Sequence, residues 1–158
     1  MAATPFQINA QVASGVVPGA ATLTVSSALG TAQQSITVSP NAPAIFLVSG
    51  VQPAVTNQDN SLNTSTNPAL RGNWIVIYAT GLGIVSGTGA LQQVTTPVSV
   101  MIGGAAITPA YSGISPGSPN GVYQVNVQLP SAMPPGLALP IYLQQGAAVS
   151  NTVMLAVE

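Results

Sequence analysis

Three side chains of this 158-residue chain are charged at neutral pH, and they set narrow limits on its chemistry. Arg71 is the only basic residue, Asp59 and Glu158 are the only acidic ones, and the sequence contains no Lys, His or Cys. General acid–base catalysis needs a group that titrates near the working pH, and a catalytic metal needs several His, Cys or carboxylate ligands. A Ser or Thr nucleophile has no ordinary base in this chain, which leaves only Tyr or terminal-amine chemistry. We therefore predict a protein that is not an enzyme, with no catalytic, cofactor-binding or metal-binding residues and no cofactor.

The loop Asn57-Gln-Asp59-Asn-Ser61 carries oxygen-bearing side chains at alternate positions, as a calcium-binding loop does. It lacks the Gly expected at the sixth position and the Glu expected at the twelfth, where this chain has Pro68. A capped turn is the favoured interpretation. Arg71 follows in the sequence, and we expect Asp59 and Arg71 to form an ion pair across the base of the loop; the alternative is that water solvates each separately.

Two further motifs suggest sites but have simpler explanations. The segment Ala79-Thr-Gly-Leu-Gly83 follows a predicted strand, but its glycine spacing does not fit a dinucleotide-binding fingerprint and the chain has no Lys to hold phosphate. We interpret it as a tight turn. The segment Asn63-Thr-Ser65 has the pattern of an N-glycosylation acceptor.

The shortage of charge also limits the partners of the chain. One basic side chain cannot neutralise a nucleic-acid backbone or hold an anionic membrane surface, so we expect no nucleic-acid partner. No apolar run reaches the roughly 18 residues of a spanning helix, so we expect no membrane insertion. Hydrophobic residues make up 47% of the chain, enough for a core. The first five residues have no basic or apolar segment, so we expect no signal peptide there; either its removal or another export route is consistent with this.

Short runs rich in Val, Ile, Thr and Tyr, separated by Gly, Pro, Asn and Ser, predict an all-β protein. We place the strands at roughly 6–12, 21–27, 34–39, 73–80, 97–102, 106–111, 122–129, 138–144 and 149–157. This spacing is typical of a sandwich or barrel. In the first run Phe6, Ile8, Ala10 and Val12 alternate with polar residues, which predicts one buried face and one solvated face.

The run Trp74-Ile-Val-Ile-Tyr78 does not alternate, which indicates a central strand covered on both faces. We therefore expect Trp74 to be a core residue. Stacking of Trp74 against a ligand is the alternative.

An internal repeat is the most informative feature of the sequence. Residues from Phe6 onward align without a gap to those from Tyr123 onward. The identical positions are Gln7, Asn9, Gln11, Ser14, Pro18, Gly19 and Ala21 in the first copy, and Gln124, Asn126, Gln128, Ser131, Pro135, Gly136 and Ala138 in the second. Each copy predicts a strand, a Pro-Gly turn, a strand, a short turn and a strand. Identity at outward polar positions favours a repeat over two unrelated hairpins.

The two copies predict two domains of unequal completeness. The second copy is preceded by at least three strands, whereas five residues precede the first. We therefore predict a partial immunoglobulin-like unit of three strands at 1–42 and a complete immunoglobulin-like antiparallel β-sandwich at 43–158. Three strands with an apolar face need a partner surface, either from the C-terminal domain or from another subunit. The candidate assembly strand is the one that carries Phe6, Ile8, Ala10 and Val12.

The order and spacing of seven motifs resemble one protein family over nearly the whole chain. These motifs are Gln7-Ile-Asn-Ala-Gln-Val12 with Pro18-Gly19, Ala42-Pro-Ala-Ile-Phe46, Thr56-Asn-Gln-Asp-Asn-Ser61, Asn67-Pro-Ala-Leu-Arg-Gly72, Tyr78-Ala-Thr-Gly-Leu-Gly83, Pro97-Val-Ser-Val-Met-Ile-Gly103 and Val122-Tyr-Gln-Val-Asn-Val-Gln-Leu-Pro130. The chain resembles the uncharacterised C-terminal tandem immunoglobulin-like (TIG-like) region of large secreted acidobacterial proteins. The resemblance implies an extracellular or cell-surface setting and a modular role, and it implies no activity or ligand.

Two functions of different class follow from these features. In the first, the chain is a non-enzymatic extracellular structural module that self-associates, as a subunit of a fibre or surface layer completed by strand addition from a neighbour. Edge strands usually carry charges that oppose such pairing, and this chain has almost none. The alternative is an adhesin-type binding module that recognises polysaccharide or another surface protein. Tyr111, Tyr123 and Tyr142 are candidate contacts by residue type alone, and core packing is the favoured interpretation for each.

Overall fold

The computed structural model describes residues 2–4, 6–13, 15–89 and 91–158, and this part of the chain is all-β with antiparallel sheets. The prediction of an all-β fold is confirmed. The described residues contain no helix that is long and apolar enough to cross a bilayer. The chain divides into two compact units, Met1–Pro40 and Asn41–Glu158.

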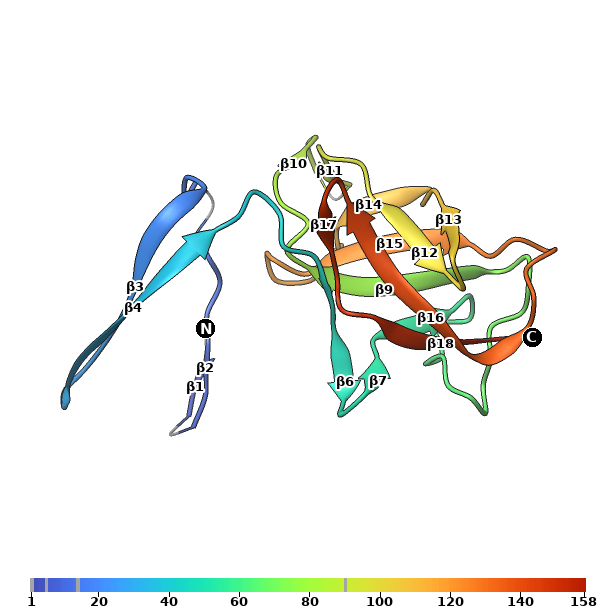
Figure 1. Ribbon diagram of the computed structural model, residues 1–158, viewed down its shortest axis with the longest axis horizontal. Helices are drawn as coiled ribbons and strands as arrows, with labels where there is room; N and C mark the ends of the chain where they lie inside the picture. Colours follow the sequence, from blue (N-terminus) through green and yellow to red (C-terminus); the bar gives the residue numbers. More distant parts are fainter. Residues whose placement is uncertain (1, 5, 14, 90) are drawn as a thin grey trace. The chain divides into compact units, whose positions relative to one another are not determined.

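The N-terminal unit consists of two antiparallel strand pairs (Figure 1). One pair joins β1 (Ala2–Ala3) to β2 (Ile8–Asn9), and the other joins β3 (Gly19–Ser27) to β4 (Gly30–Val38). The second hairpin closes with a two-residue turn, in which the Ser27 hydroxyl accepts a hydrogen bond from the backbone N–H of Leu29. Within the predicted strand at 6–12, the structure forms a strand at Ile8–Asn9, which pairs with β1.

The C-terminal unit contains two larger antiparallel sheets, shown in Figure 1. The first has the order β10 (Val85–Ser86), β11 (Gln93–Val94), β14 (Tyr111–Ile114), β15 (Tyr123–Gln128), β9 (Trp74–Thr80) and β5 (Ala44–Ile45), with β8 (Val55–Asn57) also paired to β9. The second has the order β13 (Ala105–Ile107), β12 (Ser99–Ile102), β16 (Gly136–Gln145) and β17 (Ala148–Val149), with β18 (Val153–Val157) also paired to β16. A small hairpin joins β6 (Leu47–Ser49) to β7 (Gln52–Pro53).

One hydrophobic core joins these two sheets into a β-sandwich. Ile75 and Ile77 of β9 and Val125 of β15 come from the first sheet, and Ile141 and Leu143 of β16 come from the second. All five are inaccessible to solvent. The strands alternate between these apolar residues and more accessible ones, so one face of each sheet forms the core. Burial of each such side chain contributes about 1.5–3 kcal/mol.

The prediction that Trp74 is a core residue is wrong. Strand β9 is central in its sheet, with β15 on one side and β5 and β8 on the other. Only the face with Ile75 and Ile77 is buried completely, and Trp74 lies on the opposite face with 38% of its surface exposed. A continuous apolar run indicates a central strand, but it does not show that both faces are covered by a second layer.

Candidate functional site

The loop after β8 is held by its own side chains. The Asp59 carboxylate accepts hydrogen bonds from the hydroxyl and the backbone N–H of Ser61, the latter at 3.0 Å. These bonds, with the hydroxyl the stronger influence, hold the pKa of the Asp59 carboxyl below its ordinary value. No group of three or more His, Cys, Asp or Glu side chains lies together among the residues that the structure describes. The arrangement is that of a capped turn.

The ion pair that we expect between Asp59 and Arg71 stays a prediction, and the bonds that the structure shows at these two residues involve other groups. The Asp59 carboxylate is fully exposed and bonded to Ser61 within its own turn. The backbone N–H of Arg71 donates to the carbonyl oxygen of Glu158 at 2.9 Å, and its side chain lies at the surface. A short-range bond within the turn does not require two long-range side chains to be ordered together, so it forms at a smaller entropic cost.

Asn63 is a structural residue whose role the sequence did not reveal. Its side chain is 1% exposed and makes three hydrogen bonds of 2.9 Å. The amide nitrogen donates to Asn57 Oδ1 and to the carbonyl oxygen of Ala156, and the amide oxygen accepts from the N–H of Ala156. A glycan would attach to the side-chain nitrogen of Asn63, and in this structure that nitrogen is buried and donates two hydrogen bonds.

The glycine segment after β9 is a tight structural turn. A Cβ atom on Gly81 would lie 1.9 Å from the carbonyl oxygen of Ala42, and its φ of +74° also favours glycine. The buried side chain of Gln145 donates from Nε2 to the carbonyl oxygens of Leu82 and Thr96, at 3.0 and 2.9 Å. These bonds connect the turn to β16, so its glycines and carbonyl oxygens have a structural role.

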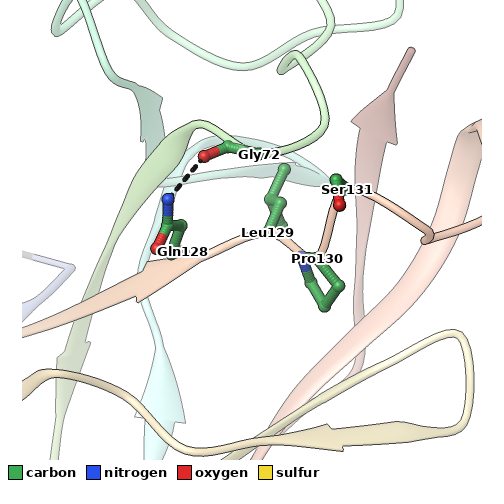
Figure 2. Close-up of a pocket in the computed structure, with 5 residues that line it drawn as sticks. All are labelled: Gly72, Gln128, Leu129, Pro130 and Ser131. Atoms are coloured by element: carbon green, nitrogen blue, oxygen red, sulfur yellow. Dashed lines mark hydrogen bonds between the residues drawn. The ribbon is translucent and has the colours of Figure 1, made fainter.

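A shallow hollow of about 260 Å³ lies at the end of β15, and Figure 2 shows the five residues that line it. Its walls are formed by Gly72, Gln128, Leu129, Pro130 and Ser131. The Gln128 amide nitrogen donates to the Gly72 carbonyl oxygen at 2.8 Å, so its polar end is already used. The hollow contains no titratable side chain and supports no catalytic role.

The three tyrosines proposed as binding contacts do not share one face. Tyr123 points into the core and its hydroxyl donates to the carbonyl oxygen of Gly83. Tyr142 lies between the buried residues Ile141 and Leu143 and therefore faces outward from the second sheet. Tyr111 pairs with Asn126 and lies on the outer face of the first sheet, where its hydroxyl donates to the carbonyl oxygen of Ile114 at 2.7 Å.

The outer face of β9, β14 and β15 combines aromatic and amide side chains. Its residues are Trp74, Val76 and Tyr78 of β9, Tyr111 of β14, and Gln124, Asn126 and Gln128 of β15. Trp74 pairs directly with Gln128, and Tyr78 pairs directly with Gln124. We call this set the aromatic–amide face.

The N-terminal unit exposes the apolar residues that the sequence predicts as an assembly strand. Phe6 is 98% exposed, Ile8 and Val12 are more than half exposed, and Ala10 is also accessible. Further large apolar side chains with at least a third of their surface exposed lie on and around the β3–β4 hairpin: Val16, Val17, Leu23, Val25, Leu29 and Ile36. We call these residues together the apolar surface of the N-terminal unit. All three charged side chains of the protein lie outside residues 1–40.

Comparisons with known protein families, with curated proteins and with solved structures found no match to this chain.

Proposed function

We propose that the chain is a non-enzymatic, extracellular structural module that self-associates through its N-terminal unit. In this proposal both units are immunoglobulin-like, and the N-terminal one is incomplete until strands from a neighbouring subunit cover it. One observation carries the proposal: an uncharged segment exposes Phe6, Ile8 and Val12 together with much of a two-stranded hairpin.

Two physical arguments support this proposal. A two-stranded hairpin is only marginally stable in water and needs further strands or a packed face. Exposed apolar patches also mark surfaces that associate, and natural edge strands are usually protected by charged residues that are absent from 1–40. The resemblance to secreted modular proteins supports an extracellular or cell-surface setting and is the basis for proposing a fibre or surface layer.

Particle mass, measured by light scattering over a wide range of protein concentration, tests this function. We expect the mass to exceed that of one chain and to rise with concentration, and electron microscopy would then show whether the assemblies are closed particles or fibres. A monomer at every concentration would overturn the proposal.

The aromatic–amide face supports a second candidate function, an adhesin-type module that binds polysaccharide. Exposed aromatic rings stack on apolar sugar faces, and amide groups can hydrogen-bond to hydroxyls. Trp74, with its partly exposed ring beside Gln128, is the residue we expect to matter most. A glycan array probed with the wild type and with Trp74→Ala tests this function, and signals unchanged by the substitution would exclude this face.

A further inference from the structure

We propose that the free edge of β3 is a homodimer interface, at which β3 of a second copy pairs antiparallel in the way that β12 pairs with β16 in the C-terminal unit. The inference rests on the proposed self-association. It specifies that the partner is a second copy of the chain and that the two copies meet at the edge of β3. It predicts a four-stranded sheet with the order β4, β3, β3 of the second copy and β4 of the second copy.

The two hairpins that the predicted repeat relates have matching registers. Gly19, directly after Pro18, pairs with Val38, and Gly136, directly after Pro135, pairs with Val157. The hairpins differ because β16 contains a bulge between Gly136 and Leu139, whereas β3 pairs with β4 without interruption.

The bulge shows which residues correspond along the strands. Four residues before Val38, Gln34 pairs with Leu23; four residues before Val157, Val153 pairs with Ile141. Leu23 and Val25 of β3 therefore take the places of Ile141 and Leu143 of β16. An ungapped alignment would instead place Thr24 and Ser26 at these core positions.

The corresponding residues differ sharply in burial. Ile141 and Leu143 are inaccessible, and β12 pairs with β16 over four consecutive residues, Ile141–Gln144. Leu23 and Val25 are 50% and 40% exposed, and β3 has β4 as its only partner strand among the described residues. The N-terminal unit therefore lacks the equivalent of β12.

The other edge of this hairpin has less need of a partner. In the C-terminal unit, no strand of the described residues lies along the outer edge of β18; loop residues bond to it instead, with Ala156 bonded to Asn63 and Ala69, and Glu158 to Ala69 and Arg71. Because β4 corresponds to β18, its outer edge can remain without a strand partner. The edge that lacks its partner is that of β3.

A second copy of β3 can replace β12 as a partner strand, because it pairs antiparallel and presents apolar residues to one face. The pairing of β12 with β16 is antiparallel, and a twofold axis brings two identical strands together antiparallel. Leu23 and Val25 alternate along β3 as Val100 and Ile102 alternate along β12, so both strands present apolar residues to one face. At a twofold interface residue i contacts residue j of the second copy and j contacts i, and an uncharged strand brings no like charges together in these contacts.

The segment that carries Phe6, Ile8 and Val12 would then cover this sheet. Its counterpart in the C-terminal unit is β15, whose Tyr123 and Val125 pack in the core against the second sheet. In the dimer, one such segment from each copy would lie over the four-stranded sheet.

Lysine substitution at one rung of the hairpin tests the edge. Thr24 of β3 and Gln33 of β4 are exposed and pair directly with each other, so Thr24→Lys and Gln33→Lys add the same charge to opposite edges. We expect Thr24→Lys to weaken dimerisation at least tenfold and Gln33→Lys to change it less than threefold, as measured by analytical ultracentrifugation. Circular dichroism checks that both variants remain folded. Equal effects, or a larger effect of Gln33→Lys, would overturn the inference.

Single cysteines provide a second test that does not depend on affinity, because the chain has no Cys of its own. Near a twofold axis a residue faces its own copy at disulfide distance. We expect oxidised dimers from at least one of Thr22→Cys, Leu23→Cys, Thr24→Cys and Val25→Cys, whichever lies nearest the axis, and not from Gln33→Cys. If the wild type is oligomeric but none of the four β3 variants crosslinks, the proposed self-association remains and this interface is excluded. A wild type that is monomeric at every concentration would overturn both.

Discussion

The side chain of Asn63 bonds to both the N–H and the carbonyl oxygen of Ala156, a residue 93 positions later in the chain. It therefore imitates the pairing of a neighbouring strand and connects the loop after β8 to β18. This contact holds the outer edge of β18, the edge that faces away from its ladder with β16.

We expect Asn63→Ala to destabilise the C-terminal unit by about 2–3 kcal/mol, because the buried N–H of Ala156 and Oδ1 of Asn57 would lose their partner. Asn120→Ala, at an exposed position, is the control and should change stability by less than about 0.5 kcal/mol. Urea unfolding measures both. Similar midpoints for the two variants would show that Asn63 does not have this role.

We expect Gly81→Ala to destabilise the same unit by on the order of 4 kcal/mol, since the new methyl group would collide with the backbone of Ala42. Gly89 has nearly the same φ, +77° against +74°, but no atom lies within 4 Å of the added position. Gly89→Ala should therefore cost only the conformational strain, about 1–2 kcal/mol. Thermal unfolding compares the two, and equal losses would contradict the collision with Ala42.

We expect Ile8→Asp to weaken self-association at least tenfold, which is about 1.4 kcal/mol, because assembly would bury a carboxylate that has no partner. Gln11→Asp adds the same charge at a position predicted to face solvent, and we expect it to leave the association within about threefold of the wild type. Light scattering against concentration measures both. An equal effect of the two substitutions would indicate general charge repulsion instead.

We expect the stability of the protein to be nearly constant from about pH 5 to about pH 9, since no side chain has an ordinary pKa in this range. Burial raises the pKa of Tyr111 and of Tyr123, so the folded state disfavours their ionised forms. Stability is then full below the unfolded pKa of about 10 and falls as the pH rises above it. Hydrogen bonds lower the pKa of Asp59, which gives a small stabilisation that is lost as the pH falls below about 4.

Melting temperatures measured from pH 3 to pH 11 test this profile. Tyr123→Phe is the matched variant for the alkaline limb, because it removes one of the two hydroxyls whose pKa is raised by burial. Its loss of stability between about pH 9 and pH 11 should be smaller than that of the wild type. A change in melting temperature centred near neutral pH would show that another group controls stability.

The strands of the sandwich could be predicted from the sequence because their signals are local. Runs rich in Val, Ile, Thr and Tyr between turn residues located β9, β12, β15 and β16 closely, and a Pro-Gly turn precedes β16 as predicted. The position of Trp74 could not be predicted in this way, because its exposure depends on whether a second layer covers that face of the sheet.

The role of Asn63 was equally hidden, since its main partner, Ala156, is distant in sequence and contributes only backbone groups. The bonds between Asp59 and Ser61 were not predicted either. Ser61 lies two residues from Asp59 and donates two hydrogen bonds to its carboxylate. The bulge in β16 was also invisible, although it decides which residues of β3 and β16 correspond.

The backbone bonds around Arg71 determine how the protein would respond to trypsin-like proteases. The chain has one cleavage site for such enzymes, after Arg71, and the amides on both sides of that peptide bond are engaged, Arg71 with Glu158 and Gly72 with Leu129. Cleavage requires a segment to be drawn into an extended form in the enzyme's groove, so these bonds must first open. The folded module should therefore survive digestion that fragments most proteins, an advantage for any structure that must last outside a cell.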